Sequence, residues 1–298
     1  MKQRTIAKCV DLVGIGLHKG VPVQMRLEPL PKDSGIVLYR KDKNVKIPLH
    51  PKNVVDTKMA TVLGKDGVSV STIEHLMSAV YSYGIDNLLV ILDNDEVPIM
   101  DGSAIAYCML LDEARICVQN APKKLLKIKR EVKVQDGEKY ALLRPSDGFA
   151  LDFTIDFDHP AIGRQHYRFA FDLPSYIEQI ARARTFGFLH QVQYLRSQGL
   201  ALGGSLDNAI VLDEKRILNP EGLRYEDEFV RHKILDAIGD LSLFGMALMG
   251  EYEAYAASHH LNHLLTQKVL EDTRNYEVVE AKTKTMEGYV IGAACAKE

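Results

Sequence analysis

The sequence predicts an α+β protein of two similar domains. Its 298 residues exceed the size of most single domains, which take about 100–200 residues. Residues 121–124, Ala-Pro-Lys-Lys, have the composition of a linker. On both sides of this linker the pattern runs through strands, a helix and a further strand. We therefore predict one domain at 1–121 and another at 126–282, followed by a tail at 283–298.

The first half contains short segments in which polar and apolar residues alternate. Such alternation is typical of strands with one buried face, and it predicts strands at 6–12, 21–27 and 35–38. A wholly apolar strand is predicted at 88–92, and the Asp-Gly pair at 101–102 marks a turn.

A helix is predicted to begin after Ser71 and to end near Gly84. Ser71 and Glu74 have the spacing of a capping box. The apolar stripe of this helix consists of Ile73, Leu76, Met77, Val80 and Tyr81. His75 points away from the stripe, toward small residues that let another element approach. Glu74 is either a cap that bonds back to Ser71 or a general base beside a metal ion.

The second half begins with strands predicted at 126–134, 141–145 and 150–157. Helices are predicted at about 175–183 and 226–249. The apolar stripe of the longer helix consists of Val230, Ile234, Ala237, Ile238, Leu241 and Phe244.

His232, Asp236 and Asp240 form a second row on the same helix, on the far side from the stripe. An imidazole and a carboxylate four residues apart can bind one metal ion, although the same spacing also occurs in simple surface pairs. A catalytic zinc takes three protein ligands and leaves one position for water, so a third ligand must come from elsewhere. His75 is the candidate for that third ligand.

Three of the ten histidines fall at His259, His260 and His263. An imidazole can transfer a proton near neutral pH, and His259 and His263 also have the spacing of two metal ligands on a helix. The local sequence leaves both roles open.

An apolar insert at about 186–211 interrupts the order of elements in the second half. It combines a short helix that contains Val192 and Leu195 with an apolar hairpin at 200–206, in which paired glycines permit a tight turn. The sequence of this segment alone is equally compatible with an ordinary loop that packs on the domain and has no role in function.

Charge and composition exclude several classes of protein. The chain has 37 basic and 40 acidic residues, a formal charge of −3, which does not favour nucleic-acid binding. No apolar run approaches the roughly 20 residues that span a bilayer, and the N-terminus lacks the layout of a secretory signal. The four cysteines, Cys9, Cys108, Cys117 and Cys295, have no C-x-x-C spacing. We expect free thiols in a cytoplasmic monomer.

Several blocks of this sequence, in the same order, resemble the UDP-3-O-acyl-N-acetylglucosamine deacetylases, the zinc-dependent amidases of lipid A biosynthesis. These blocks are GIGLH at 14–18, STIEHL at 71–76, EVPIMDGS at 96–103, RARTFGF at 182–188 and DEFVRHKILDAIGD at 227–240. The resemblance covers nearly the whole chain. It implies two similar α+β domains whose helices pack together between outer sheets.

The resemblance also implies roles for particular residues. His75, His232 and Asp236 match the zinc ligands, although iron(II) suits the same side chains. Glu74 matches the base that deprotonates water. The other catalytic positions are His259 as the acid that protonates the leaving amine, Asp240 as its partner and Thr185 as a hydrogen-bond donor to the oxyanion.

The implied substrate is a nucleotide-sugar lipid, UDP-3-O-acyl-N-acetylglucosamine. Lys233, Phe157 and His18 match substrate-binding positions. The insert implies a passage for the acyl chain, lined by Val192, Leu195, Leu200 and Ala201. The family usually reads Ser-Gly-His at the acid, whereas this chain reads Ser258-His259-His260, so the choice of His259 rests on the Leu-Asn pair that follows.

Two other classes of protein remain open at this point. A non-catalytic relative that binds a nucleotide sugar would keep the fold without turnover. An unrelated zinc hydrolase is disfavoured because the sequence contains neither H-E-x-x-H nor H-x-E with P-C-x-x-C.

Overall fold

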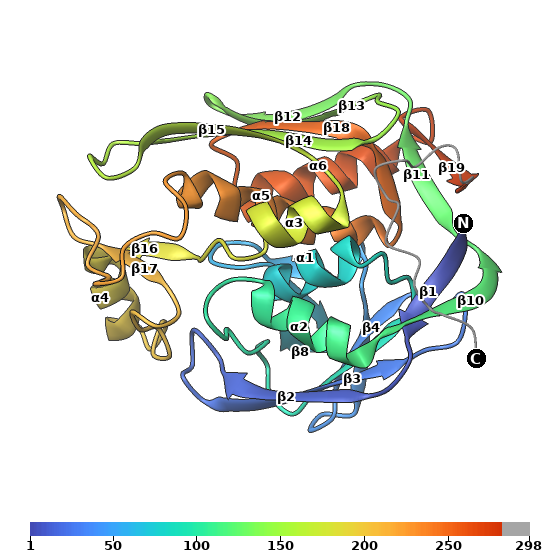
Figure 1. Ribbon diagram of the computed structural model, residues 1–298, viewed down its shortest axis with the longest axis horizontal. Coiled ribbons are helices and arrows are strands. Elements are labelled where there is room, and N and C mark those ends of the chain that lie inside the picture. Colours follow the sequence, from blue (N-terminus) through green and yellow to red (C-terminus); the bar gives the residue numbers. More distant parts are fainter. Residues whose placement is uncertain (282–298) are drawn as a thin grey trace.

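The computed structural model describes residues 1–281 and has two outer layers of sheet with helices packed between them (Figure 1). This arrangement confirms the predicted α+β class. Within the described residues, no helix is both long and apolar enough to cross a membrane. The predicted tail at 283–298 and Cys295 lie outside the described residues.

Thirteen elements form the first half of the chain. They are β1 (Lys2–Ile6), β2 (Val10–Ile15), β3 (Pro22–Pro29), β4 (Ile36–Arg40), β5 (Val45–Pro48), η1 (Pro51–Asn53), β6 (Val54–Asp56), β7 (Val62–Lys65), β8 (Val68–Val70), α1 (Glu74–Ser82), β9 (Leu88–Leu92), α2 (Ile105–Ala114) and β10 (Ile116–Pro122). The main sheet has the order β2-β3-β9-β4-β5, with β6-β7-β8 as a smaller sheet and β1-β10 as a pair.

The second half is built around a seven-stranded sheet. Its elements are β11 (Lys124–Ile128), β12 (Val132–Asp136), β13 (Lys139–Arg144), β14 (Phe149–Phe157), β15 (Gly163–Ala170), α3 (Leu173–Gln179), β16 (Phe186–Phe188), α4 (Leu189–Ser197), β17 (Ile210–Leu212), α5 (Glu228–Leu241), η2 (Ser242–Phe244), β18 (Ala247–Tyr255), α6 (His259–Glu271) and β19 (Tyr276–Glu280). β18 lies inside this sheet, parallel to β11 and β14 and antiparallel to β13.

Helices α1 and α5 lie at the centre of the molecule. Every residue of α1 is buried, and so are twelve of the fourteen residues of α5. α1 and α5 pack against each other between the sheets (Figure 1). The polar row of α5, His232, Asp236 and Asp240, is buried. A buried polar row requires partners, and these partners form the site described below.

Several predicted boundaries are wrong. The strand predicted at 6–12 is two strands, β1 and β2, and the strand predicted at 126–134 is β11 and β12. The helix predicted at 226–249 ends with α5 at Leu241, because the apolar residues that extended its stripe belong to η2 and β18. Apolar periodicity alone does not distinguish the end of a buried helix from the start of a buried strand.

The predicted capping box is also wrong. α1 begins at Glu74 with Ile73 as its N-cap, which makes no side-chain cap bond. Ser71 instead forms a β-bridge with Glu96, which fixes the chain before the helix. The side chain of Glu74 is therefore free for another role.

The four residues predicted as a linker instead belong to β10 and β11 or join them. Lys123 is buried between β10 and β11, and its ammonium donates to Asp86 Oδ1 at 2.6 Å and to Gly84 O at 2.9 Å. Strand pairing changes here, because β10 pairs with β1 whereas β11 pairs with β18 and β19. The division at 1–121 and 126–282 stays a prediction.

The predicted insert forms a projection at one end of the molecule (Figure 1). β16 and β17 pair in parallel, and α4 followed by a run of turns connects them. The hairpin predicted at 200–206 is absent from this described segment. The Asn208 side chain bonds to Gly203 O and Ser205 N and so folds the loop without strand pairing.

Candidate active site

A buried group of two imidazoles and one carboxylate lies where α1 meets α5. His75 is the second residue of α1, and His232 and Asp236 lie one turn apart on α5. His75 Nε2 is 3.5 Å and His232 Nε2 is 3.4 Å from Asp236 Oδ1. One ligand atom from each residue lies within 4.8 Å of the other two. The structure thus brings together the three residues that the sequence singled out as metal ligands.

The donor set fits a divalent metal ion. Bonds of about 2.0–2.1 Å in tetrahedral geometry separate two zinc ligands by about 3.3 Å, close to the separations observed. Asp236 Oδ1 is buried and has no hydrogen-bond partner among the described residues, which is costly unless a cation binds it. The other oxygen of Asp236 accepts from Lys233 Nζ at 2.7 Å. These three side chains could therefore hold a metal.

His232 presents the correct ring nitrogen to this group. Its Nδ1 lies 3.0 Å from the carbonyl oxygen of Ala183, which can only accept, so Nδ1 carries the proton and Nε2 offers a lone pair. Burial lowers the pKa of His232 to about 3 and keeps the ring neutral. Burial acts to raise the pKa of Asp236, but its neighbours, among them the ammonium of Lys233, outweigh this effect and hold that pKa well below its ordinary value.

Glu74 lies next to His75 and faces the histidine cluster. Its Oε2 accepts from Thr61 N at 3.1 Å, and its Oε1 is 3.7 Å from His259 Nε2. Burial raises the pKa of the Glu74 carboxyl, an effect that His259 and His75 oppose. A raised pKa brings a carboxylate closer to the range in which it accepts a proton from water at neutral pH.

His259, at the start of α6, forms a dyad with Asp240. His259 Nδ1 lies 2.8 Å from Asp240 Oδ2, and that oxygen also accepts from Asn262 Nδ2 at 2.8 Å. Burial acts to lower the pKa of His259, but the carboxylates of Asp240 and Glu74 outweigh it and raise the pKa to about 10. The ring is therefore cationic at neutral pH and can donate a proton from Nε2.

The other two histidines of the cluster do not contact these carboxylates. His260 is exposed, and its Nδ1 lies 3.3 Å from Thr57 Oγ1. His263 is half-buried, its Nδ1 has no hydrogen-bond partner in the part of the chain that the structure describes, and burial lowers its pKa. Of these three histidines, His259 is therefore the one that lies against the carboxylates of Asp240 and Glu74.

The backbone at Thr185 is held by contacts that the sequence did not predict. Its N–H donates to Gly102 O at 2.8 Å, and a Cβ on Gly102 would meet Asn208 O at 2.0 Å, so only glycine fits there. The buried guanidinium of Arg184 bonds to the buried carboxylate of Glu228 at 2.9 Å. This ion pair anchors Thr185 and the Ala183 carbonyl against the start of α5.

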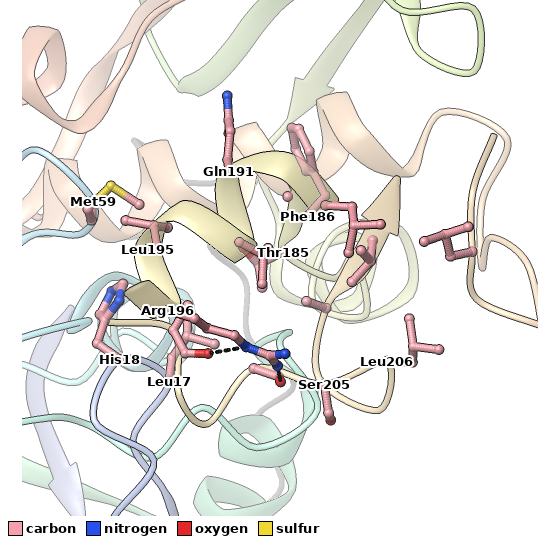
Figure 2. A pocket seen from close by; sticks show the side chains of 18 residues that line it. Leu17, His18, Met59, Thr185, Phe186, Gln191, Leu195, Arg196, Ser205 and Leu206 are labelled. Atoms are coloured by element: carbon pink, nitrogen blue, oxygen red, sulfur yellow. Dashed lines mark hydrogen bonds between the residues drawn. The ribbon is translucent and has the colours of Figure 1, made fainter. Parts of the chain in front are cut away.

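An apolar cavity of about 400 Å³ opens beside Thr185 (Figure 2). Val192 and Leu195 of α4 line it, together with Ala201 in the loop that follows. Leu200, which the sequence placed in the same lining, is half-buried and does not line this cavity. Figure 2 shows Met59 and Leu195 among the residues that line the cavity.

Aromatic residues connect the cavity with the three candidate ligands. Phe186 lines the cavity, and its ring centroid lies 6.3 Å from that of His232 and 5.6 Å from that of Phe157. Lys233 Nζ lies 5.7 Å from the Phe186 ring. Neither Phe157 nor Lys233 lines the cavity itself, but Phe157 packs on Phe186, and Lys233 lies near Phe186 and bonds to Asp236.

His18 also lines the cavity. Its backbone N–H donates to the buried carboxylate of Glu96 at 2.9 Å, whereas both of its ring nitrogens are buried without a hydrogen-bond partner in residues 1–281. An imidazole in that condition is available to a polar group of a ligand. Glu96 lies in the EVPIMDGS block and fixes this loop, a role that the sequence did not reveal.

Thr61 and Asn262 also contribute to the site, and the sequence offered little to identify them. Thr61 lies in a segment without a motif, far along the chain from its partner Asp240. Asn262 marked the register of the histidine cluster, but its contact with Asp240 was not predicted. By contrast, Arg184 and Glu228 lie in the sequence blocks at 182–188 and 227–240. These blocks pointed to both residues, but not to the ion pair that they form.

Comparisons with known proteins agree with one another. A family model described as UDP-3-O-acyl N-acetylglycosamine deacetylase matches residues 3–271. Three similar proteins are each named UDP-3-O-acyl-N-acetylglucosamine deacetylase. That of a Nitratiruptor species is 74% identical over 298 residues, covering 100% of both chains. That of Wolinella succinogenes is 65% identical over 279 residues, covering 94% of both, and that of Helicobacter pylori (strain J99) is 59% identical over 287 residues, covering 96% of this chain and 97% of that one.

Proposed function

Because the chain belongs to the UDP-3-O-acyl N-acetylglycosamine deacetylase family, we propose that His75, His232 and Asp236 bind the metal ion of a metal-dependent deacetylase. The protein hydrolyses the acetamide of UDP-3-O-acyl-N-acetylglucosamine in lipid A biosynthesis. The products are acetate and the corresponding UDP-3-O-acyl-glucosamine.

The observation that carries these residue roles is the convergence of three buried ligand atoms next to Glu74 and His259. We propose zinc as the metal, because mixed imidazole and carboxylate ligation suits it. Iron(II) would accept the same ligands. When bound, the metal supplies Lewis-acid chemistry, since it polarises a carbonyl and makes water more acidic.

Glu74 and His259 divide the proton transfers between them. Glu74, whose pKa is raised by burial, accepts a proton from the attacking water. His259, cationic through Asp240 and Glu74, donates a proton to the nitrogen of the leaving amine. Hydrolysis consumes one water, breaks the C–N bond and leaves the amine and acetate, so one base and one acid suffice.

Thr185 and the neighbouring residues bind and orient the substrate. The Thr185 hydroxyl is proposed as a donor to the oxygen of the acetamide carbonyl, which gains negative charge during attack. Lys233 provides a cation beside Asp236, Phe157 offers an aromatic face to a planar base, and His18 offers unpaired ring nitrogens.

The cavity beside Thr185 is proposed to receive the 3-O-acyl chain. Val192, Leu195 and Ala201 make its wall apolar, and Thr185 lies at the same cavity, so a chain bound there would be joined to a sugar near the ligands. Leu200 is proposed only as a support for the loop, since it lies outside the lining.

We propose that the enzyme is cytoplasmic and monomeric. Cys9, Cys108 and Cys117 are free thiols in the described part of the chain, as expected in a reducing compartment. Every catalytic role given above is filled by one copy of the chain, so no partner subunit is required.

A direct test measures acetate released from UDP-3-O-acyl-N-acetylglucosamine and from the non-acylated UDP sugar. We expect turnover of the acylated substrate to be far faster, to stop on removal of metal by a chelator, and to return with added zinc. Chelator-resistant release would contradict the metal site, and equal rates on both substrates would contradict the acyl passage.

A further inference from the structure

We propose that Thr61 is a positioning residue that holds the two carboxylates used in proton transfer, Glu74 and Asp240, in their working orientations. This inference rests on the proposed function, which assigns a base role to Glu74 and makes Asp240 the partner of the acid. Thr61 lies immediately before β7 and is only 1% exposed. Within the described part of the chain, it makes no hydrogen bond to the three candidate ligands, and it does not line the apolar cavity.

All three polar groups of Thr61 bond to the region where α1 meets α5. Its N–H donates to Glu74 Oε2 at 3.1 Å, and its hydroxyl donates to Asp240 Oδ1 at 2.6 Å. Its carbonyl oxygen accepts from Ile73 N, just before α1, at 3.5 Å. One residue thus connects a carboxylate at the start of α1 with a carboxylate near the end of α5.

These bonds determine which oxygen of each carboxylate faces His259. With Oε2 of Glu74 bound to Thr61, Oε1 faces His259 Nε2 at 3.7 Å. With Oδ1 of Asp240 bound to Thr61, Oδ2 is the oxygen that meets His259 Nδ1 at 2.8 Å. A carboxylate without these donors could rotate and leave His259 between two poorly aligned partners.

The loop that carries Thr61 is tied to the histidine cluster at its other end. Thr57 Oγ1 lies 3.3 Å from His260 Nδ1, and Met59, between the two threonines, lines the acyl cavity. Segment 57–61 therefore reaches α6, the cavity and both carboxylates within five residues. A loop held at both ends gives Thr61 a defined position, which its role requires.

The first test is kinetic and uses Thr61→Val, which removes the hydroxyl but keeps the shape and the backbone N–H. We expect kcat to fall about ten- to a hundredfold, the effect of losing a hydrogen bond to a charged group, with KM and metal content unchanged. Thr61→Ser, which restores the hydroxyl, should recover most of the lost turnover. Thr5→Val is the matched control, because Thr5 is buried and its hydroxyl bonds to Asn87 O, away from the site.

A double-mutant cycle distinguishes positioning from a general structural defect. If Thr61 acts through Asp240, Thr61→Val should add little to the kcat loss of Asp240→Asn. A structural defect would instead multiply the two losses. Multiplicative losses, or an unchanged kcat in Thr61→Val, would overturn the proposal.

A measurement independent of turnover completes the test. The His259 Nδ1 proton, bonded to Asp240, should give a downfield proton resonance in zinc-loaded and metal-free protein. Thr61→Val should shift or broaden this resonance, and Thr5→Val should not. An unchanged resonance in Thr61→Val would overturn the positioning role. Absence of acetate release by the wild type would contradict the proposed function, while the resonance would still decide the role of Thr61.

Discussion

A Cβ atom placed on Gly239 of α5 would lie 2.1 Å from the carbonyl oxygen of Glu74 on α1. The two helices therefore touch at the residue proposed as the base. The close approach also places Asp240, the next residue after Gly239, near the start of α1, where Thr61 bonds to both carboxylates.

Gly239→Ala should accordingly damage both stability and activity. Alanine favours a helix interior over glycine by about 1 kcal/mol, but overpacking of a rigid contact costs about 1–3 kcal/mol, so the net effect is destabilising. We expect a lower urea midpoint and a kcat reduced about tenfold or more, because about 1 Å of displacement is costly in catalysis. Gly148→Ala is the control, since a Cβ there meets no atom of the described residues within 4 Å. Wild-type stability in Gly239→Ala would contradict the close contact.

The sequence predicted α1 and α5, together with their polar residues, because both helices have clear apolar stripes. It did not predict that the row of His232, Asp236 and Asp240 is buried as well, since periodicity identifies a face but not what covers it. Gly239 was a visible signal, because glycine inside a helix is costly and often marks a packing contact.

The contacts that position the site were less predictable. The bond between Thr61 and Asp240 spans 179 residues, and no local pattern indicates such a contact. The run of turns after α4 was predicted as a hairpin because paired glycines suit one, yet the side chain of Asn208 folds the loop instead. The sequence thus predicted the proposed metal ligands, but it did not predict the contacts that hold the site in place.

Removal of one proposed ligand should abolish metal binding. In His232→Ala only His75 and Asp236 remain, and two ligands do not hold a catalytic zinc in place. We expect metal affinity to fall by more than the roughly 10- to 100-fold lost when a residue that orients a ligand is changed. Metal analysis of the purified variant measures this, with His166→Ala as the control because His166 is exposed and bonds to Asp152. Full metal content in His232→Ala would exclude His232 as a ligand.

The acidic limb of the pH profile should belong to Glu74. A base works only when deprotonated, so activity falls as the pH drops through its pKa, which burial raises above the ordinary carboxyl value. Glu74→Gln should keep the metal, lose about a hundredfold or more in kcat and flatten this limb. Measurement of kcat across pH with parallel metal analysis tests the assignment, and a variant that keeps its acidic limb would contradict it.

The alkaline limb should belong to His259. An acid works only when protonated, so activity falls as the pH rises through the pKa of His259. This pKa is about 10 in the protein without a metal ion. The positive charge of a bound metal would lower it. We expect this limb between the ordinary histidine value of 6.5 and about 10. His259→Ala should lose about a hundredfold or more in kcat and flatten the limb. His260→Ala, at an exposed neighbour, is the control, and a larger loss there would reverse the assignment.

The last prediction concerns the cavity beside Thr185. Ala201 is buried in its wall, whereas the adjacent Leu202 is 52% exposed and does not line it. Ala201→Glu places a charge where an acyl chain would lie, and each methylene denied burial weakens binding about fourfold, or about 0.8 kcal/mol. The increase in KM of the variant over the wild type should therefore be larger for longer acyl chains. Metal content and turnover of a short-chain substrate should stay close to those of the wild type. Leu202→Glu should leave KM unchanged for every chain length. An equal loss of activity on long-chain and short-chain substrates would instead indicate that Ala201 supports the loop. The proposal that the cavity binds the acyl chain would then be wrong.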